Sequence, residues 1–284
     1  MRRDRVICKK TNIWFNLTQS YLRNRYYSPS IGRFITEDPI KDGFNWYAYC
    51  HNDSINFRDF NGYTEYYVNG AFPQFILDHT FPYNPNAVAT KEDEESWKKW
   101  NNMAFYSGFV PWLQDASKAY KHYLENTGTE MKIDYERAYN EDKVIRSIID
   151  DEILKMQTVV KWLYDDQWGT DFRITGEMVS VPNGDSENWQ KTIGAHQTFG
   201  VGDVIINENT GIATMRVTFY MEDMYNFNPG AADIATGIPD DENGRFSELG
   251  WAKEFKTYGS LEKTVTWQLF TPVGATAKKK GNGR

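Results

Sequence analysis

A change of hydrophobic pattern near residue 168 constrains the fold of this chain more than any other feature. Upstream, apolar side chains recur at helical spacing and predict a helix over 140–166 that packs on a core. Downstream, from about residue 171, strand-forming residues alternate with polar ones. The pattern therefore predicts an α+β fold, with a helical half at about 91–168 packed on a β-rich half at about 171–270. The apolar residues at helical spacing are Ile145, Ile149, Ile153, Met156, Val160 and Leu163.

Shorter sequence patterns predict further helices and strands in both halves. The segment KEDEESWKKWNNMAFYS begins with acids, which favour a helix N-terminus, and a second helix is expected near Pro111. GDVII and IATMRVTFY flank a polar turn at Asn207–Gly211 and predict a hairpin, while KTVTWQLF predicts a further strand. The Gly-, Asp- and Asn-rich stretch 228–245 is too long for a plain turn, and long structured loops often carry function.

Composition excludes some classes of activity. A formal charge of −7 and a pI near 5.3 disfavour a protein that coats nucleic acid, although a local basic groove would still suit a nuclease. The cysteines, Cys8 and Cys50, both precede residue 62, so the rest of the chain has no thiolate for a zinc site or a nucleophile. No apolar run approaches the length of a membrane span, and the basic N-terminus lacks the apolar core of a secretory signal.

One segment carries a dense motif, LRNRYYSPSIGRFITEDPIKDGFNWYAYCHNDSINFRDFNG, at residues 22–62. It resembles the closing signature of the Rhs/YD-repeat core of bacterial polymorphic toxins, in which a variable toxin follows the signature. The resemblance implies three parts: a core remnant at 1–62, a linker at 63–90 with Pro73, Pro82 and Pro85, and a toxin domain at 91–284. The matching residues are Arg25-Tyr26-Tyr27, Pro29, Gly32-Arg33-Phe34, Asp38-Pro39, Asn45, Tyr47-Ala48-Tyr49, Asn52, Asn56, Asp59 and Gly62.

The same resemblance implies self-cleavage by an aspartyl mechanism. Two carboxylates that share a proton can activate a water and protonate the leaving amide. Carried over by motif, these carboxylates are Asp38 and Asp59, with Arg25 as the supporting charge and the cut after Tyr63. The family's D-P-x-G step is Asp59-Phe60-Asn61-Gly62 here, and Tyr63 stands where Leu or Met is usual.

A second motif follows the strand predicted at IATMRVTFY and leads into the long loop. Asp223-Met224-Tyr225-Asn226-Phe227-Asn228 is similar to the D-x-Y-D-F-N motif of the colicin M family, bacteriocins that cleave the peptidoglycan precursor lipid II. Glu248-Leu249-Gly250-Trp251-Ala252 occupies the place of that family's L-G-containing helix. The likeness covers about 35 residues, Asn226 replaces the motif's second Asp, and the family's His-Arg pair has no counterpart here.

The resemblance implies a hydrolase of a pyrophosphate-linked lipid. Such chemistry needs a water activated by a carboxylate or a bound Mg²⁺, and a cation near the phosphate. The candidate residues are Asp223 and Asp233 as base or Mg²⁺ ligands, Tyr225 and Asn226 from the motif, Arg245 as a phosphate clamp and His196 as a further catalytic candidate. Asp233 and Arg245 are chosen by position rather than by motif.

We therefore expect the toxin module of an Rhs-type interbacterial competition system that hydrolyses lipid II, a lipid-linked cell-wall precursor. The implied partner is a cognate immunity protein. The implied location is a target cell, in the periplasm or at the outer face of the inner membrane, after secretion or delivery. Two alternatives stay open: a cytosolic nuclease toxin, which the acidic pI disfavours, and a non-enzymatic pore-forming or binding tip.

Overall fold

The chain divides into two compact units, Met1–Tyr66 and Tyr67–Arg284. Their boundary falls within β5 (Glu65–Val68), inside the stretch predicted as a linker. The computed structural model describes residues 20–22, 24–39, 45–50, 57–59, 65–68, 72–232 and 237–272.

The first unit is built from the signature residues. β1 (Ser20–Leu22), β2 (Arg25–Ser28) and β3 (Arg33–Phe34) form an antiparallel sheet in that order, and β4 (Phe57–Asp59) follows later in the chain. Aromatic rings pack between the strands: the ring centroids of Tyr27 and Tyr49 are 4.3 Å apart, and those of Phe34 and Tyr49 are 5.7 Å apart. The aromatic rings of Tyr27, Phe34 and Tyr49, which come from separate parts of the signature, thus form one small core.

A long, mostly antiparallel sheet forms the frame of the second unit. Its strands follow the order β7-β9-β10-β11-β6, β8 pairs with β9, and the last two residues of β5 pair with β7. The hairpin turn at Asn207–Gly211 is confirmed, since Asn207 pairs with Ile212 and the Asn207 side chain accepts the Asn209 and Thr210 N–H groups. The strands are β6 (Met131–Ile133), β7 (Asp171–Thr175), β8 (Val179–Val181), β9 (His196–Asn207), β10 (Ile212–Tyr225) and β11 (Phe255–Gln268).

Helices occupy most of the segment predicted to be helical, and the α+β prediction is confirmed. A three-residue strand, β6, interrupts it and pairs in parallel with β11. Neither periodicity nor propensity signals so short a strand, because its pairing partner lies more than a hundred residues away. The helices are α1 (Lys91–Ser107), α2 (Gln114–Leu124), α3 (Tyr135–Glu141), α4 (Lys143–Asp165), α5 (Glu187–Gln190) and α6 (Asp240–Glu248).

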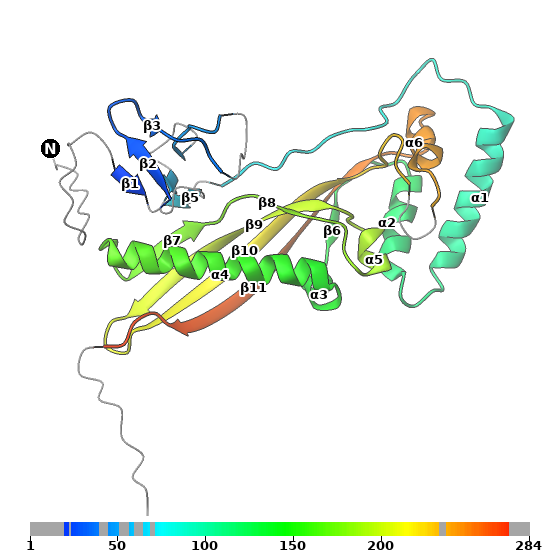
Figure 1. Cartoon of the computed structure of the whole chain (residues 1–284). Helices are drawn as coiled ribbons and strands as arrows, with labels where there is room; N and C mark the ends of the chain where they lie inside the picture. Colours follow the sequence, from blue (N-terminus) through cyan, green and yellow to red (C-terminus); the bar gives the residue numbers. More distant parts are fainter. Residues whose placement is uncertain are drawn as a thin grey trace, which may run out of the picture. The chain divides into compact units, whose positions relative to one another are not determined.

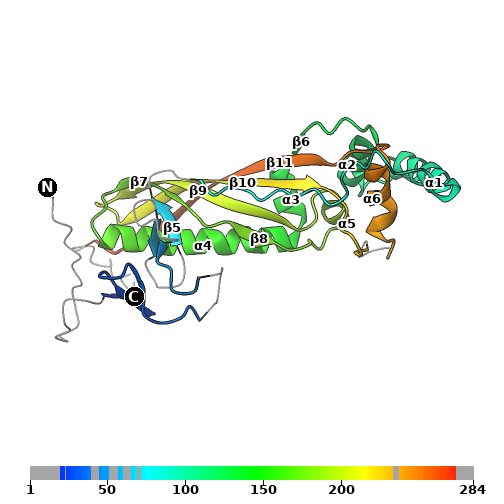
Figure 2. The same ribbon diagram turned by 90° about the horizontal axis from the view of Figure 1, so that it is seen from above.

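The longest helix, α4, runs along the sheet and covers one of its faces (Figures 1 and 2). All six residues of the predicted apolar stripe are buried, so the predicted core helix is confirmed. Gly200 and Gly202 of β9 lie under Met156, whose sulfur and methyl carbon would each lie 3.2 Å from a β-carbon added at one of these glycines. Two glycines therefore let the helix approach the sheet closely.

The second unit ends in a helical cluster at the far end of the long strands, where α1 packs on α2 and α6 (Figures 1 and 2). Trp97 of α1 meets Phe246 of α6 with ring centroids 5.1 Å apart. Helix α6 takes up the last third of the stretch expected to be a loop at 228–245. Residues 72–90 contain no helix or strand and pack here, where the Phe81 N–H donates to Glu254.

Within the described residues, no helix combines the length and apolar character that a membrane crossing requires.

Candidate functional site

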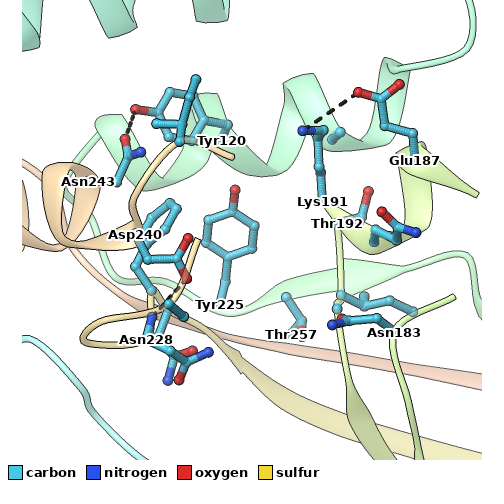
Figure 3. A pocket seen from close by; sticks show the side chains of 18 of the residues that line it. Tyr120, Asn183, Glu187, Lys191, Thr192, Tyr225, Asn228, Asp240, Asn243 and Thr257 are labelled. Carbon is cyan, nitrogen blue, oxygen red and sulfur yellow. Dashed lines mark hydrogen bonds and ion pairs between the residues drawn. The ribbon is translucent and has the colours of Figure 1, made fainter. Parts of the chain in front are cut away.

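A cavity of about 440 Å³ opens at the end of β10, among α1, α2, α5 and α6 (Figure 3). Its apolar lining comes from α1, the start of α2, the end of β10 with the chain after it, and the segment after α5. Its polar lining comes from these segments and also from α5, the chain before it, α6 and β11. The apolar residues include Trp100, Met103, Ala104, Leu113 and Ala116, and the polar ones include Asn183, Glu187, Lys191, Asp223, Asn228 and Asp240.

Asp223 is the carboxylate that lines this cavity among the predicted site residues that the structure describes. Burial, together with the smaller effect of the Asp78 charge, raises the pKa of its carboxyl to about 7, and a backbone hydrogen bond from Met224 opposes the shift. Thr257 of β11 donates its hydroxyl to the Asp223 carbonyl at 3.2 Å, which ties this end of β10 to the neighbouring strand. A carboxyl with a pKa near neutrality can accept or donate a proton at physiological pH.

Tyr225 and Asn226 line the same cavity. The Tyr225 ring stacks on Phe255 with centroids 4.9 Å apart, and its hydroxyl points into the cavity between Asp240 and Lys191 (Figure 3). The three motif residues Asp223, Tyr225 and Asn226 thus line the same cavity.

The departure of Asn226 from the family motif has a local reason. Its amide Nδ2 donates to the carbonyl and the carboxylate of Asp78, at 3.3 and 3.4 Å. An aspartate at position 226 would lose this donor and would face Asp78, whose charge already raises the pKa of Asp223.

Lys191 supplies the cationic side chain among the described residues that line the cavity. Its ammonium lies 3.6 Å from the Glu187 carboxylate, one helical turn earlier (Figure 3). Sequence reasoning missed Lys191, because it stands in the unremarkable run NWQKTIG with no motif around it. Only the packing of the segment after α5 against the end of β10 brings it near Asp223.

Arg245, the predicted phosphate clamp, does not line the cavity. Its guanidinium lies 2.9 Å from Glu248 and 3.5 Å from Asp93, and it donates to the carbonyl of Val88 at 3.1 Å. The hydrogen bond to Glu248 raises the pKa of Arg245. These contacts hold α6 against the start of α1, so Arg245 stabilises the packing of these two helices.

His196, the further catalytic candidate, is buried at the start of β9 and does not line the cavity either. Its Nε2 lies 2.9 Å from the Tyr135 hydroxyl and its Nδ1 lies 3.1 Å from the Gly194 carbonyl. Burial lowers the pKa of His196 to about 4, which keeps the ring neutral at physiological pH. Its surroundings are those of a satisfied core histidine.

Asp233, the second proposed Mg²⁺ ligand, lies outside the described residues. Among the described residues, no group of three or more His, Cys, Asp or Glu side chains is placed to hold a metal ion. The cavity does offer single oxygen donors from Asp223, Asn183 and Asn228, the ligand type that Mg²⁺ prefers.

The residues predicted for self-cleavage converge in the first unit. The Arg25 guanidinium lies 3.2 Å from the Asp38 carboxylate and 3.4 Å from that of Asp59, and all three side chains are buried. The same guanidinium stacks on the Phe34 ring at 3.6 Å from its centroid. Tyr63, at the predicted cut, lies outside the described residues.

Comparison with known proteins yields short or distant likenesses. No family model matches the chain. The uncharacterized protein YibJ of Escherichia coli (strain K12) is 55% identical over 38 residues, which cover 13% of this chain and 16% of YibJ. The solved structure of PaeM, a colicin M-like bacteriocin produced by Pseudomonas aeruginosa, aligns at a TM-score of 0.34 and 18% identity, over 54% of this chain and 51% of PaeM. The alignments thus span about a sixth of YibJ and half of PaeM.

Proposed function

We propose that this chain is the toxin module of an Rhs-type interbacterial competition system, and that its second unit hydrolyses a phosphate-linked lipid precursor of the cell wall, lipid II. The supporting observation is that three motif residues, Asp223, Tyr225 and Asn226, line one cavity of about 440 Å³. Lys191 in the same lining provides the positive charge that phosphate chemistry needs.

The reaction follows from the protonation state of Asp223. The ionised carboxylate takes a proton from a water molecule as the water oxygen bonds to phosphorus. The phosphorus–oxygen bond to the leaving group breaks, and its electron pair stays on the departing oxygen. The Lys191 ammonium stabilises the negative charge that builds on the phosphoryl oxygens, and the Tyr225 hydroxyl orients the phosphate.

Mg²⁺ stays part of the proposal. When bound, it would polarise a phosphoryl oxygen. Asp223 is the predicted ligand in the cavity lining that would hold it.

The proposed setting follows from the substrate. Lipid II is used at the outer face of the inner membrane, so the toxin would act in the periplasm of a target bacterium after secretion or delivery. The producing cell would need a cognate immunity protein. In the first unit, Asp38 and Asp59 would form the cleaving pair held by Arg25, and the cut would follow Tyr63.

The deciding experiment incubates the full chain with lipid II in detergent micelles, with and without Mg²⁺. We expect release of a water-soluble, phosphate-bearing sugar product. Parallel incubations with total RNA and plasmid DNA should leave both intact, and their degradation would instead identify a nuclease. In cells, toxicity should require an added periplasmic signal, and toxicity confined to the cytoplasm would refute the proposal.

Self-cleavage has its own readout. Mass spectrometry of the purified chain should find a fragment that ends at Tyr63, and Asp38→Asn should prevent its formation. Asp59→Asn should do the same, whereas Glu37→Gln, at an exposed neighbour, should leave cleavage unchanged. An intact wild-type chain after prolonged incubation would remove self-cleavage from the proposal.

A further inference from the structure

The last turn of α1 and its connection to α2 present large apolar rings to solvent. We name these four residues the aromatic tip: Phe105 (58% exposed), Tyr106 (67%), Phe109 (71%) and Trp112 (68%). Three of the rings are in contact, with centroids 5.4 Å apart for Phe105 and Tyr106 and again for Phe105 and Phe109, and Trp112 follows three residues after Phe109. Scattered exposed apolar residues are common, but a contiguous exposed patch marks an interaction surface.

The backbone of the tip is held by its own hydrogen bonds. The Phe109 N–H donates to the Tyr106 carbonyl at 3.0 Å, and the Gln114 amide donates to the carbonyls of Gly108 and Val110 at 3.0 and 2.9 Å. The rings are therefore presented on an ordered turn, which lowers the entropy cost of burying them in a partner.

Charge is distributed along α1 in a way that selects the partner. Asp, Glu, Lys and Arg are all absent from residues 100–114, although a quarter of the chain is charged. The four acids of α1 lie at residues 92–95, about 15–20 Å from Phe105 at 1.5 Å per residue. Asp115, which follows the uncharged stretch, forms an ion pair with Arg137. The ammonium of Lys121 lies at the base of the tip, since a β-carbon added at Gly108 would lie 2.6 Å from its Nζ.

Together these features match a phospholipid surface. Trp and Tyr side chains favour the boundary between headgroups and acyl chains, where the ring is buried and its polar atom stays hydrated. A nearby ammonium is attracted to anionic headgroups, and acids would be repelled by them. The connection between α1 and α2, which contains Phe109 and Trp112, lies in the helical cluster at one end of the long strands (Figures 1 and 2).

We infer that the aromatic tip docks the second unit onto the interfacial layer of a phospholipid bilayer. Met103, Ala104 and Leu113, next to the tip, line the cavity, so docking brings the cavity close to the lipid surface. The inference depends on the exposed surface alone and stands apart from the reaction proposed for Asp223.

The test is co-sedimentation of the full chain with vesicles of phosphatidylcholine, alone or mixed with phosphatidylglycerol. The wild type should sediment with both and more strongly with the anionic vesicles. The triple variant Phe105→Ser/Phe109→Ser/Trp112→Ser should bind at least about tenfold more weakly. The matched control Leu154→Ser/Ile205→Ser removes two equally exposed apolar side chains from α4 and β9 and should bind like the wild type.

Further measurements separate the remaining outcomes. The single variant Phe109→Ser repeats the comparison with less change to the turn, and circular dichroism checks that each variant folds. Lys121→Gln should reduce the preference for anionic vesicles, and Asp223→Asn should bind normally whatever its effect on hydrolysis. A wild type that stays in the supernatant, or a triple variant that sediments fully, would overturn the inference. So would a wild-type dimer that the triple substitution dissociates without any vesicle binding, because the tip would then contact a second copy.

Discussion

Two carboxyl groups of the second unit, the buried Glu152 and the half-buried Asp223, have similar acidity and opposite surroundings. Burial raises the pKa of Glu152 on α4 to about 7, and it raises the pKa of Asp223 on β10 to about 7 as well. Glu152 lies under the sheet, only 2% exposed, with one oxygen against Gly176 and the other 3.3 Å from Lys155. Asp223 lies in the wall of a cavity that a substrate could enter.

The difference between these groups is one of access. A raised pKa does not by itself identify a functional site, because burial of a carboxyl in a packed core produces the same shift. At Glu152 the shift records the free-energy cost of ionising a carboxyl inside a packed core. At Asp223 the same shift accompanies a cavity, a tyrosine and a lysine, and there the carboxyl can exchange protons with a bound molecule.

The largest expected effect is on the rate of hydrolysis, which should depend on the Asp223 carboxyl and not on that of Glu152. Asp223→Asn should lower the rate of lipid II hydrolysis by about 10²–10⁴-fold, since it removes the proposed proton acceptor. Glu152→Gln, the matched control, should keep activity within about twofold when assayed below the unfolding temperature. Equal losses in both variants, measured as initial rates, would mean that the shared pKa shift and not the cavity identifies the catalytic group.

The next largest effect distinguishes Glu152 from Asp223 by the pH dependence of the free energy of unfolding. The pKa of Glu152 is raised on folding, so the folded state holds its proton more tightly and stability declines as pH rises from about 4.5 to about 7. Glu152→Gln cannot ionise and should be more stable than the wild type by about 2–3 kcal/mol at pH 8.5, with little difference at pH 4. Urea unfolding at the two pH values measures this.

Lys155→Gln provides the control for that measurement. It removes the ammonium that lowers the pKa of Glu152, so stability at pH 8.5 should fall below that of the wild type. A Glu152→Gln variant with the wild-type pH profile would mean that Glu152 does not titrate in this range.

A smaller effect tests the cation of the cavity. Lys191→Ala should lower kcat/KM by about tenfold to a hundredfold, because the developing phosphoryl charge loses its neighbouring ammonium. Lys191→Arg should restore part of the activity, whereas Lys155→Ala, beside the buried Glu152, should leave kcat/KM unchanged. Unaltered kinetics in Lys191→Ala would remove this residue from the proposed site.

The smallest effect is expected at Arg245. Its partly exposed ion pairs with Asp93 and Glu248 should contribute less than about 1 kcal/mol, so Arg245→Ala should lower the free energy of unfolding only slightly. Its hydrolytic rate should stay within about twofold of the wild type, since the side chain does not line the cavity. A hundredfold loss of rate would show that Arg245 moves into the site when substrate binds.

Local patterns predicted the elements but not every side chain within them. The apolar stripe of α4 and the hairpin turn at Asn207–Gly211 follow from periodicity and turn chemistry. Glu152 of α4 is charged and lies outside that apolar stripe, yet it is buried, because Gly176 leaves space for its carboxylate under the sheet. Local patterns do not predict strand β6, because it is stabilised by pairing with β11, which lies more than a hundred residues later in the sequence.

By itself, the sequence determined where helix changes to strand, and it placed Asp223, Tyr225 and Asn226 together because they are neighbours in one motif. The tertiary structure decided which distant side chains join them. Lys191 and Asp78 come to this end of β10 from 32 and 145 residues away, and Arg245 turns toward Asp93. The physical reason is that periodicity encodes the face on which a residue lies, whereas the neighbour across a cavity depends on strand register and on how helices pack.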